Sequence, residues 1–261
     1  MKQIYLFSLS VILVAFVSLF QACTTVPVTG RTQLTGMVSD TEIVKQSIMQ
    51  FEMMKRQWPI EHDPFMNDML QEVGLRISEE VFWDMPLAEW EFIVFDNPNE
   101  INAFAMPGGK VGVFSAIFGL CKTEDQLAAV VAHEIAHVTA RHTHEQYSQA
   151  MLNNAGGTVV GLTTGGIGSL VYGMDAQTRQ AASSQRKESE ADRIGIIYMA
   201  RAGYDPQGAI DVMEKMVSLE GGARMTSRNA SHPSSVDRLN DLLLYLDEAK
   251  IEYEKAKAAR F

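Results

Sequence analysis

Residues 133–137, His-Glu-Ile-Ala-His, constrain this chain more than any other feature of its sequence. Apolar residues at helical spacing surround the stretch, and Thr123 stands where such a helix would begin. Four helical residues turn by about 400°, so both imidazoles project from one face. They can close on a single tetrahedral cation, with Glu134 beside it to handle a proton. The pattern predicts half of a zinc hydrolase site; the alternative is an unrelated pair of core or surface histidines.

A third ligand must come from elsewhere in the chain. Metzincin peptidases carry a histidine at the place of Thr143, so this sequence excludes their arrangement. A long helical stretch downstream carries Glu188 and Asp192, which share a face at a spacing of four. One of the two can bind zinc while the other accepts a hydrogen bond from a ligand imidazole. Glu190 is expected to point elsewhere. The alternative is a solvated charged face formed with neighbouring basic residues.

Three separated blocks resemble the gluzincin peptidases that include the CAAX prenyl protease, the mitochondrial Oma-type protease and bacterial HtpX. The first two are the 133–137 stretch and the Glu188-to-Asp192 block. In the third, residues 99–111 (NEINAFAMPGGKV) look like the strand and turn that precede the zinc helix in that family. The resemblance covers residues 40–246. It implies that one zinc ion per chain is bound by His133, His137 and Glu188 and that Glu134 is the catalytic base, which leaves Asp192 to orient a ligand.

His232, in a turn before the last helix, resembles a histidine that faces the active site in this family. There it either stabilises the oxyanion or occupies the fourth zinc position and holds the enzyme latent. The alternative is a structural histidine in an ordered loop. We expect His142 to pack near the zinc helix or to orient a ligand, and His144 to lie on the surface.

These assignments predict peptide hydrolysis. Zinc held by two imidazoles and a carboxylate leaves one position for water, whose pKa the metal lowers toward about 7. Glu134 then takes a proton from that water and passes it to the departing amine. The competing hypothesis is a non-catalytic, zinc-stabilised periplasmic scaffold or holdase, which captures unfolded chains without cutting them.

We predict a predominantly helical α+β fold with a small antiparallel sheet. Helices are expected over residues 40–56, 64–81, 176–202 and 235–259. Strands are expected over residues 90–95, 101–105 and 110–114. An extended peptide can add to an edge of such a sheet through its main chain, so we expect substrate to contact Asn102, Ala103, Phe104 and Ala105. This mode of binding suits unfolded or misfolded polypeptides.

The 261 residues, 46% of them hydrophobic, suffice for one sizeable core, and no repeat array is evident. We therefore predict a single zinc metallopeptidase domain over residues 40–261. The formal net charge of −10 makes nucleic acid an unfavourable partner.

The N-terminus indicates the compartment. Lys2 and the apolar run that follows it make residues 1–22 look like a bacterial lipoprotein signal peptide. Cleavage before Cys23 would leave this cysteine lipidated, residues 23–39 as a tether, and Cys121 without a disulfide partner. The domain would then face the periplasm of the bacterial cell envelope, anchored by lipid in the outer membrane. The alternative, an uncleaved transmembrane anchor, also places it outside the cytoplasm.

Residues 155–174 contain no charged side chain and are rich in glycine and threonine. Their length raises the hypothesis of a membrane-embedded, HtpX-like enzyme, but this many glycines weaken both a helix and its insertion. We expect a buried helical hairpin or a lid beside the cleft.

Overall fold

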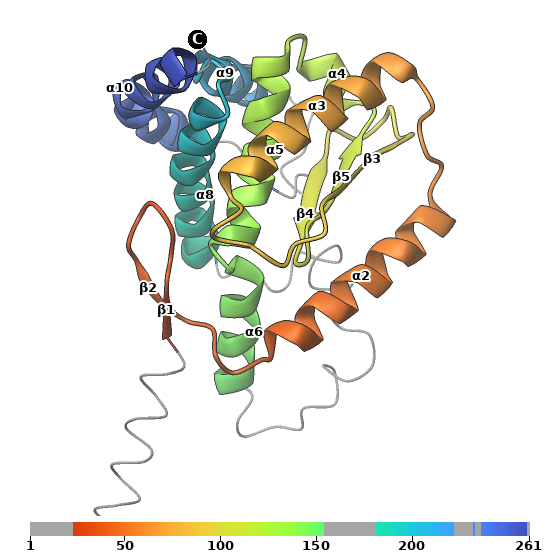
Figure 1. Ribbon diagram of the computed structural model, residues 1–261, viewed down its shortest axis with the longest axis vertical. Helices are drawn as coiled ribbons and strands as arrows, with labels where there is room; N and C mark the ends of the chain where they lie inside the picture. Colours follow the sequence, from red (N-terminus) through yellow and green to blue (C-terminus); the bar gives the residue numbers. More distant parts are fainter. Residues whose placement is uncertain (1–22, 154–180, 222–231, 233–235, 260–261) are drawn as a thin grey trace, which may run out of the picture.

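The computed structural model of the chain describes residues 23–153, 181–221, 232 and 236–259 (Figure 1). Its elements, in chain order, are β1 (Cys23–Thr25), β2 (Thr32–Leu34), α2 (Asp40–Gln57), α3 (Pro64–Glu80), β3 (Glu91–Phe95), β4 (Ala103–Met106), β5 (Lys110–Phe114), α4 (Ile117–Leu120), α5 (Glu124–Thr139), α6 (His142–Asn153), α8 (Ala181–Arg201), α9 (Gln207–Gly221) and α10 (Val236–Ala259). The predicted class, α+β and predominantly helical, is confirmed. The predicted signal peptide and the 155–174 stretch lie outside the described residues.

Helix α5, which carries residues 133–137, lies between α8 and the sheet and also contacts α3 and α9 (Figure 1). Its side chains Leu127, Val131 and Ile135 are fully buried. The Thr123 hydroxyl accepts a hydrogen bond from the backbone N–H of Gln126 at 3.3 Å, as expected for the helix cap. Because close packing on several sides fixes this helix, the side chains that it presents are held in place.

The sheet is mixed rather than antiparallel. In the order β3-β5-β4, β4 pairs antiparallel with β5, while β3 pairs parallel with β5. The chain reverses between β3 and β4 and again at the turn through Gly108 and Gly109, whose φ angles are 92° and 86°. β5 therefore regains the direction of β3, and its burial along the whole strand suits the central place. The prediction was wrong for the β3–β5 pair, and β4 lies at an edge.

An aromatic cluster joins α2 to the sheet. Phe51 of α2 and Trp58 just after it pack against Phe95, Phe104 and Phe114 of the three strands, mostly edge to face. Other buried strand residues belong to the larger core formed with α3, α5 and α8. The two cores hold the sheet in a fixed position against α5.

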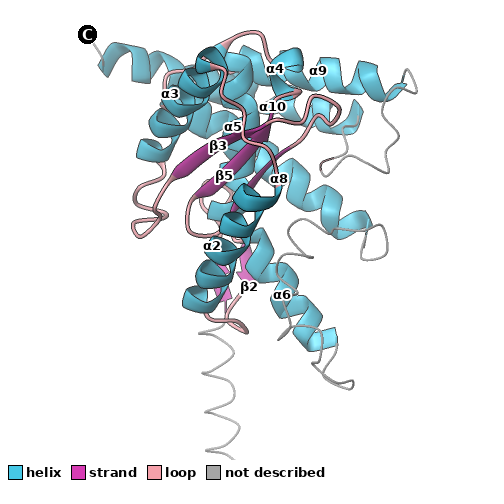
Figure 2. Ribbon diagram, turned by 90° about the vertical axis from the view of Figure 1, so that its right-hand side faces the viewer, coloured by secondary structure: helices cyan, strands magenta, loops and turns pink. Residues whose placement is uncertain are grey.

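Residues 23–34 form a β-hairpin where we expected a tether. The strands pair antiparallel from Cys23 with Leu34 to Thr25 with Thr32. The hairpin lies alongside α6 (Figure 2), and Gln33 Nε2 donates a hydrogen bond to Ala140 O at 2.6 Å, at the C-terminal end of α5. The glycine and proline of this segment mark a tight turn on a packed element, not a flexible linker.

Several element boundaries agree with the prediction to within one residue. Helix α2 begins at Asp40, and α3 begins at Pro64 with Asp63 Oδ1 accepting a hydrogen bond from Met66 N at 3.1 Å. The last helix also lies where it was expected. Across the ranges that the structure describes, we find no helix with both the length and the apolar character needed to cross a membrane.

Candidate metal centre

Three histidines and one glutamate meet where α5 faces α8. His133 and His137 project from α5 and Glu188 from α8, and His232 joins them from the segment before α10; one donor atom of each lies within 4.8 Å of the others. His133 Nε2 is 3.1 Å from His137 Nε2 and 3.4 Å from Glu188 Oε2. His137 Nε2 is 3.5 Å from Glu188 Oε1. The structure thus brings together the three predicted ligands and adds His232 as a fourth group.

These spacings fit a tetrahedral zinc ion. Bonds from zinc to nitrogen or oxygen of about 2.0–2.1 Å place neighbouring ligand atoms roughly 3.3 Å apart. His232 Nδ1 also fits, because it lies 3.4 Å from His133 Nε2 and 3.0 Å from Glu188 Oε1. Imidazole nitrogens with a carboxylate are a donor set that suits zinc. The cluster can therefore hold one such ion, with His232 at the fourth corner.

Gly195 allows α8 to approach α5 closely enough for Glu188 to reach the histidines. A Cβ atom at this position would lie 3.0 Å from His133 N and 3.1 Å from Ala132 C, closer than side chains normally approach backbone. Glu188 precedes Gly195 by seven residues, which is about two turns along the same face of α8. The missing side chain at Gly195 therefore sets the distance from Glu188 to α5.

Burial and mutual contact set the charges of the cluster. Burial lowers the pKa of His137 well below its ordinary value, so this imidazole is neutral and offers a lone pair. Burial alone would raise the pKa of Glu188, but His232 and His133 hold it well below its usual range. Burial also acts to lower the pKa of His133, yet Asp192 and Glu188 raise it to about 10. A negative potential that holds a proton this strongly also favours a divalent cation.

A buried acid–arginine pair orients His133. His133 Nδ1 lies 2.9 Å from Asp192 Oδ1, and Arg238 of α10 donates to both carboxylate oxygens of Asp192 at 2.8 Å. Arg238 Nη1 also lies 3.2 Å from Glu188 Oε2. Since His133 Nε2 faces the cluster, its Nδ1 carries the proton and donates it to Asp192. Asp192 thus makes the contact that its spacing from Glu188 predicted. The part of Arg238 was not predicted.

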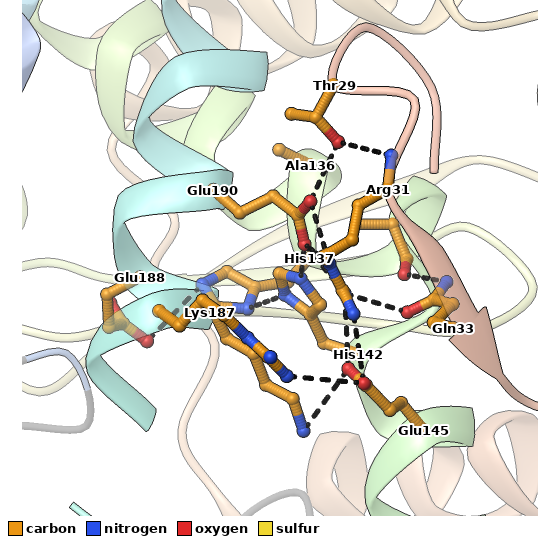
Figure 3. A network of polar contacts seen from close by, with 12 residues as sticks. Thr29, Arg31, Gln33, Ala136, His137, His142, Glu145, Lys187, Glu188 and Glu190 are labelled. Carbon is orange, nitrogen blue, oxygen red and sulfur yellow. Dashed lines mark hydrogen bonds and ion pairs between the residues drawn. The ribbon is translucent and has the colours of Figure 1, made fainter. Parts of the chain in front are cut away.

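A second histidine orients His137. His137 Nδ1 lies 2.9 Å from His142 Nδ1, and His142 Nε2 lies 3.1 Å from Glu190 Oε2 (Figure 3). In an unbroken helix, His142 would point about 140° away from His137. Instead α5 ends at Thr139, and the chain turns through Arg141, with φ 55°, before α6 begins. This left-handed residue directs the side chain of His142 back toward His137.

Two residues beside the cluster lie in surroundings that the sequence did not predict. Glu190 points away from the ligand cluster, as expected, but it is buried and accepts hydrogen bonds from Arg31 and Thr29. His144 was expected on the surface, but it is only 5% exposed, and burial lowers its pKa to about 4. Both differences come from tertiary packing. The turn at Arg141 directs the start of α6, with His144, into the interior, and the N-terminal hairpin covers Glu190.

Glu134 is buried between the ligand cluster and an apolar pocket. Its Oε2 lies 3.5 Å from His232 Nε2, and burial raises the pKa of the Glu134 carboxyl. The pocket beside it is lined by His133 and, among others, by Ile101, Asn102, Ala103, Val130, Met213 and Met216. A buried carboxylate that borders both the cluster and a pocket is placed to exchange a proton with a bound molecule.

The four residues expected to contact substrate lie in different surroundings. Asn102 and Ala103 line the pocket beside Glu134. The Phe104 side chain instead belongs to the aromatic cluster against α2, and Ala105 is partly buried against the larger core. Only the first two side chains therefore face the site, although β4 offers its backbone along one edge.

The two cysteines are not joined by a disulfide. Cys23 is exposed at the start of β1. Cys121 is buried, its Sγ donates to Gln126 O at 3.5 Å, and burial raises the pKa of the thiol to about 12, so it is unreactive.

The chain is similar to known peptidases. The model of Peptidase family M48 matches residues 64–245. The mitochondrial metalloendopeptidase OMA1 of Saccharomyces cerevisiae is 38% identical over 174 residues, which cover 64% of this chain and 50% of that protein. The beta-barrel assembly-enhancing protease of Escherichia coli K12 is 36% identical over 198 residues, which cover 70% of this chain and 39% of that protein.

The chain thus spans half or less of the length of these relatives. The matched range includes all four residues of the cluster as well as Glu134. The family resemblance seen in the sequence is confirmed, and the chain belongs to Peptidase family M48.

Proposed function

We propose that this protein is a zinc-dependent endopeptidase that holds one zinc ion through His133, His137 and Glu188. The observation that carries the proposal is the spacing of these donor atoms, 3.1–3.5 Å, next to the buried carboxylate of Glu134. Membership of a peptidase family whose relatives include a named metalloendopeptidase supports it. When bound, zinc supplies a Lewis acid that makes water a stronger nucleophile and polarises the peptide carbonyl.

Glu134 is the proposed general base. It takes a proton from the attacking water and delivers it to the amine nitrogen as the peptide C–N bond breaks. The raised pKa of this buried carboxyl suits a group that must gain and lose a proton near neutral pH. Asp192 keeps the proton of His133 on Nδ1, so that Nε2 presents its lone pair to the metal.

His232 is proposed to hold the site closed. Its ring reaches both sides of the centre: Nδ1 lies 3.0 Å from Glu188 Oε1, and Nε2 lies 3.5 Å from Glu134 Oε2. The ring thus fills the space between the metal ligands and the base, where water and the peptide carbonyl must enter. This geometry favours the fourth-ligand role over oxyanion stabilisation. A closing role predicts that His232→Ala raises the rate of peptide cleavage, whereas an oxyanion role predicts that it lowers the rate.

The proposed substrates are unfolded or misfolded polypeptides. The edge of β4 can pair with an extended chain whatever its sequence, and the apolar pocket beside Glu134 can receive an apolar side chain. The name of the Escherichia coli relative, a beta-barrel assembly-enhancing protease, supports a role in the quality control of outer-membrane proteins.

We further propose a lipoprotein of the bacterial cell envelope, anchored through Cys23. The signal-like pattern of residues 1–22 and the exposure of Cys23 support this location. In bacterial cells, labelled palmitate should enter the chain and be lost in a Cys23→Ala variant. Labelling that survives this substitution would exclude Cys23 as the anchor.

The competing function is a zinc-stabilised scaffold or holdase that binds unfolded chains without cutting them. One experiment separates the two. The chain from Thr24 onward is purified, its zinc content is measured, and cleavage of unfolded casein is followed beside the Glu134→Gln variant. An endopeptidase binds about one zinc per chain in both forms and loses cleavage in the variant. Zinc without cleavage, in the parent chain and in His232→Ala alike, would favour the scaffold.

A further inference from the structure

The N-terminal hairpin, residues 23–34, contacts the C-terminal end of α5, which carries the metal ligand His137, and also contacts α6 and α8. Gln33 Nε2 donates to Ala140 O at the end of α5. Arg31 Nη1 donates to Glu145 Oε1 of α6 at 3.0 Å. On α8, Glu190 accepts from Thr29 Oγ1 at 2.7 Å and from Arg31 (Figure 3). A segment that is distant from the site in sequence therefore packs against the helices that hold the site.

A continuous chain of polar contacts runs from Arg31 to His137. Arg31 Nε donates to both oxygens of Glu190, at 3.0 Å and 2.8 Å. Glu190 Oε2 lies 3.1 Å from His142 Nε2, and His142 Nδ1 lies 2.9 Å from His137 Nδ1. Glu190 and His142 are both buried, 8% and 3% exposed, so water cannot readily replace these contacts.

The donors and acceptors along this chain allow one consistent arrangement. His137 Nε2 faces the ligand cluster and offers a lone pair, so the proton of the neutral ring is on Nδ1 and is donated to His142 Nδ1. His142 then carries its own proton on Nε2 and donates it to Glu190. Glu190 accepts because Arg31 and Thr29 donate to it. Each contact therefore fixes the tautomer and the ring orientation of the next.

We propose that Arg31 is a positioning residue for the metal centre, which acts through Glu190 and His142 to hold His137 in its ligand orientation, and that the N-terminal hairpin is thereby part of the site. The proposal rests on the proposed role of His137 as a ligand. It also means that a displacement of the segment that begins at Cys23 is transmitted to the metal centre. Loss of comparable outer contacts weakens metal binding by about 10- to 100-fold.

The test is a double-mutant cycle on metal affinity in the full chain, measured by competition with a zinc chelator. Arg31→Ala should raise the zinc dissociation constant by about 10-fold. In a His142→Ala background the same substitution should change the zinc dissociation constant little further, because the chain of contacts to His137 is already broken. Arg186→Ala is the matched control, since Arg186 contacts Glu145, with Nη2 3.5 Å from its Oε1, at a point outside the chain of contacts to His137. Its dissociation constant should stay at the parent value.

A second readout separates positioning from general stability. With cobalt in place of zinc, the visible absorption of the ion reports ligand geometry, and Arg31→Ala and Glu190→Gln should both alter it. Glu190→Gln keeps the shape of the side chain, so it gives the answer even where Arg31→Ala folds poorly. An unchanged dissociation constant and spectrum in a folded Arg31→Ala or Glu190→Gln protein would overturn the proposal. Additive effects of Arg31→Ala and His142→Ala would do the same. If the parent chain binds no zinc, the proposed metal site fails as well.

Discussion

Two chains of polar contacts orient the two histidines of α5, and they differ in length and in the elements that carry them. His133 donates directly to Asp192, which Arg238 holds through two bonds in a buried pair. His137 donates to His142, which in turn donates to Glu190. There the arginine is Arg31, on a hairpin rather than a helix, with 20% of its side chain exposed. We call these the Asp192 arm and the Glu190 arm.

Both arms use the same device, in which an arginine fixes a carboxylate that fixes an imidazole, but they attach it to different parts of the molecule. The Asp192 arm lies between the long helices α8 and α10, and it should be rigid as long as the protein is folded. The Glu190 arm ends on a short hairpin near the N-terminus. An arm of this kind can be loosened without unfolding the core, because local elements open at a lower free energy than the whole fold.

The largest effect is expected for Asp192→Ala. It leaves the guanidinium of Arg238 buried with one carboxylate partner fewer, and breaking a buried pair costs about 3–5 kcal/mol. We expect the free energy of unfolding, measured with urea in the presence of chelator, to fall by this amount. Asp192→Asn, which keeps the shape, should lose less. If Asp192→Ala and Arg31→Ala lowered the free energy of unfolding equally, the expected difference between the two arms would be contradicted.

Gly195→Ala should weaken both arms together, because Glu188, Glu190 and Asp192 all lie on α8. The new Cβ, 3.0 Å from His133 N, must push α8 away from α5, and overpacking of this kind costs about 1–3 kcal/mol. The zinc dissociation constant should rise with the loss of stability. Gly119→Ala is the control, since a Cβ there meets no atom within 4 Å. A Gly195→Ala protein with parental zinc affinity would contradict this account of the helix contact.

The contribution of Glu190 to the free energy of unfolding should decrease as the pH falls. Burial acts to raise the pKa of Glu190, but hydrogen bonds from His142, Arg31 and Thr29 bring it to about 2. A carboxyl whose pKa is lower in the folded than in the unfolded chain adds stability above about pH 4.5, and this stability is lost as the pH falls toward about 2. Metal-free Glu190→Gln should therefore lose less stability than the parent between about pH 6 and about pH 3 in urea unfolding.

The control for this pH experiment is Glu79→Gln, which removes an exposed glutamate of α3. Its loss of stability on acidification should follow the parent curve. A Glu190→Gln curve parallel to the parent would mean that Arg31 does not hold this carboxylate in the ionised form.

The smallest effect is expected for Thr29→Val, which removes one hydrogen bond of 2.7 Å to Glu190 and leaves Arg31 in place. Such a bond contributes about 0.5–1.5 kcal/mol. We expect a drop of that size in the free energy of unfolding and a zinc affinity within about threefold of the parent. Thr24→Val, in the same hairpin but bonded to Thr35, should not change zinc affinity. If Thr29→Val weakened zinc binding as much as Arg31→Ala, Thr29 rather than Arg31 would hold the arm.

Local patterns in the sequence predicted the parts of the site that one helix can encode. The i,i+4 spacing placed His133 with His137 on α5, and the same spacing placed Glu188 with Asp192 on α8, because side-chain direction within a helix follows from its period. The cap at Thr123 was predicted from the residues that follow it directly in the chain. Such features depend on residues only a few positions apart.

The helical class, the two half-sites and the chemistry that they can support are therefore encoded in short stretches of sequence. The parallel pairing of β3 with β5, the burial of His144 and the contact of Arg31 with Glu190 arise only when distant elements pack together; Arg31 and Glu190 lie 159 positions apart. A lone arginine in a segment with glycine and proline carries no periodic signal that would predict such a contact. Long-range contacts depend on how whole elements pack, and no spacing along the chain records that.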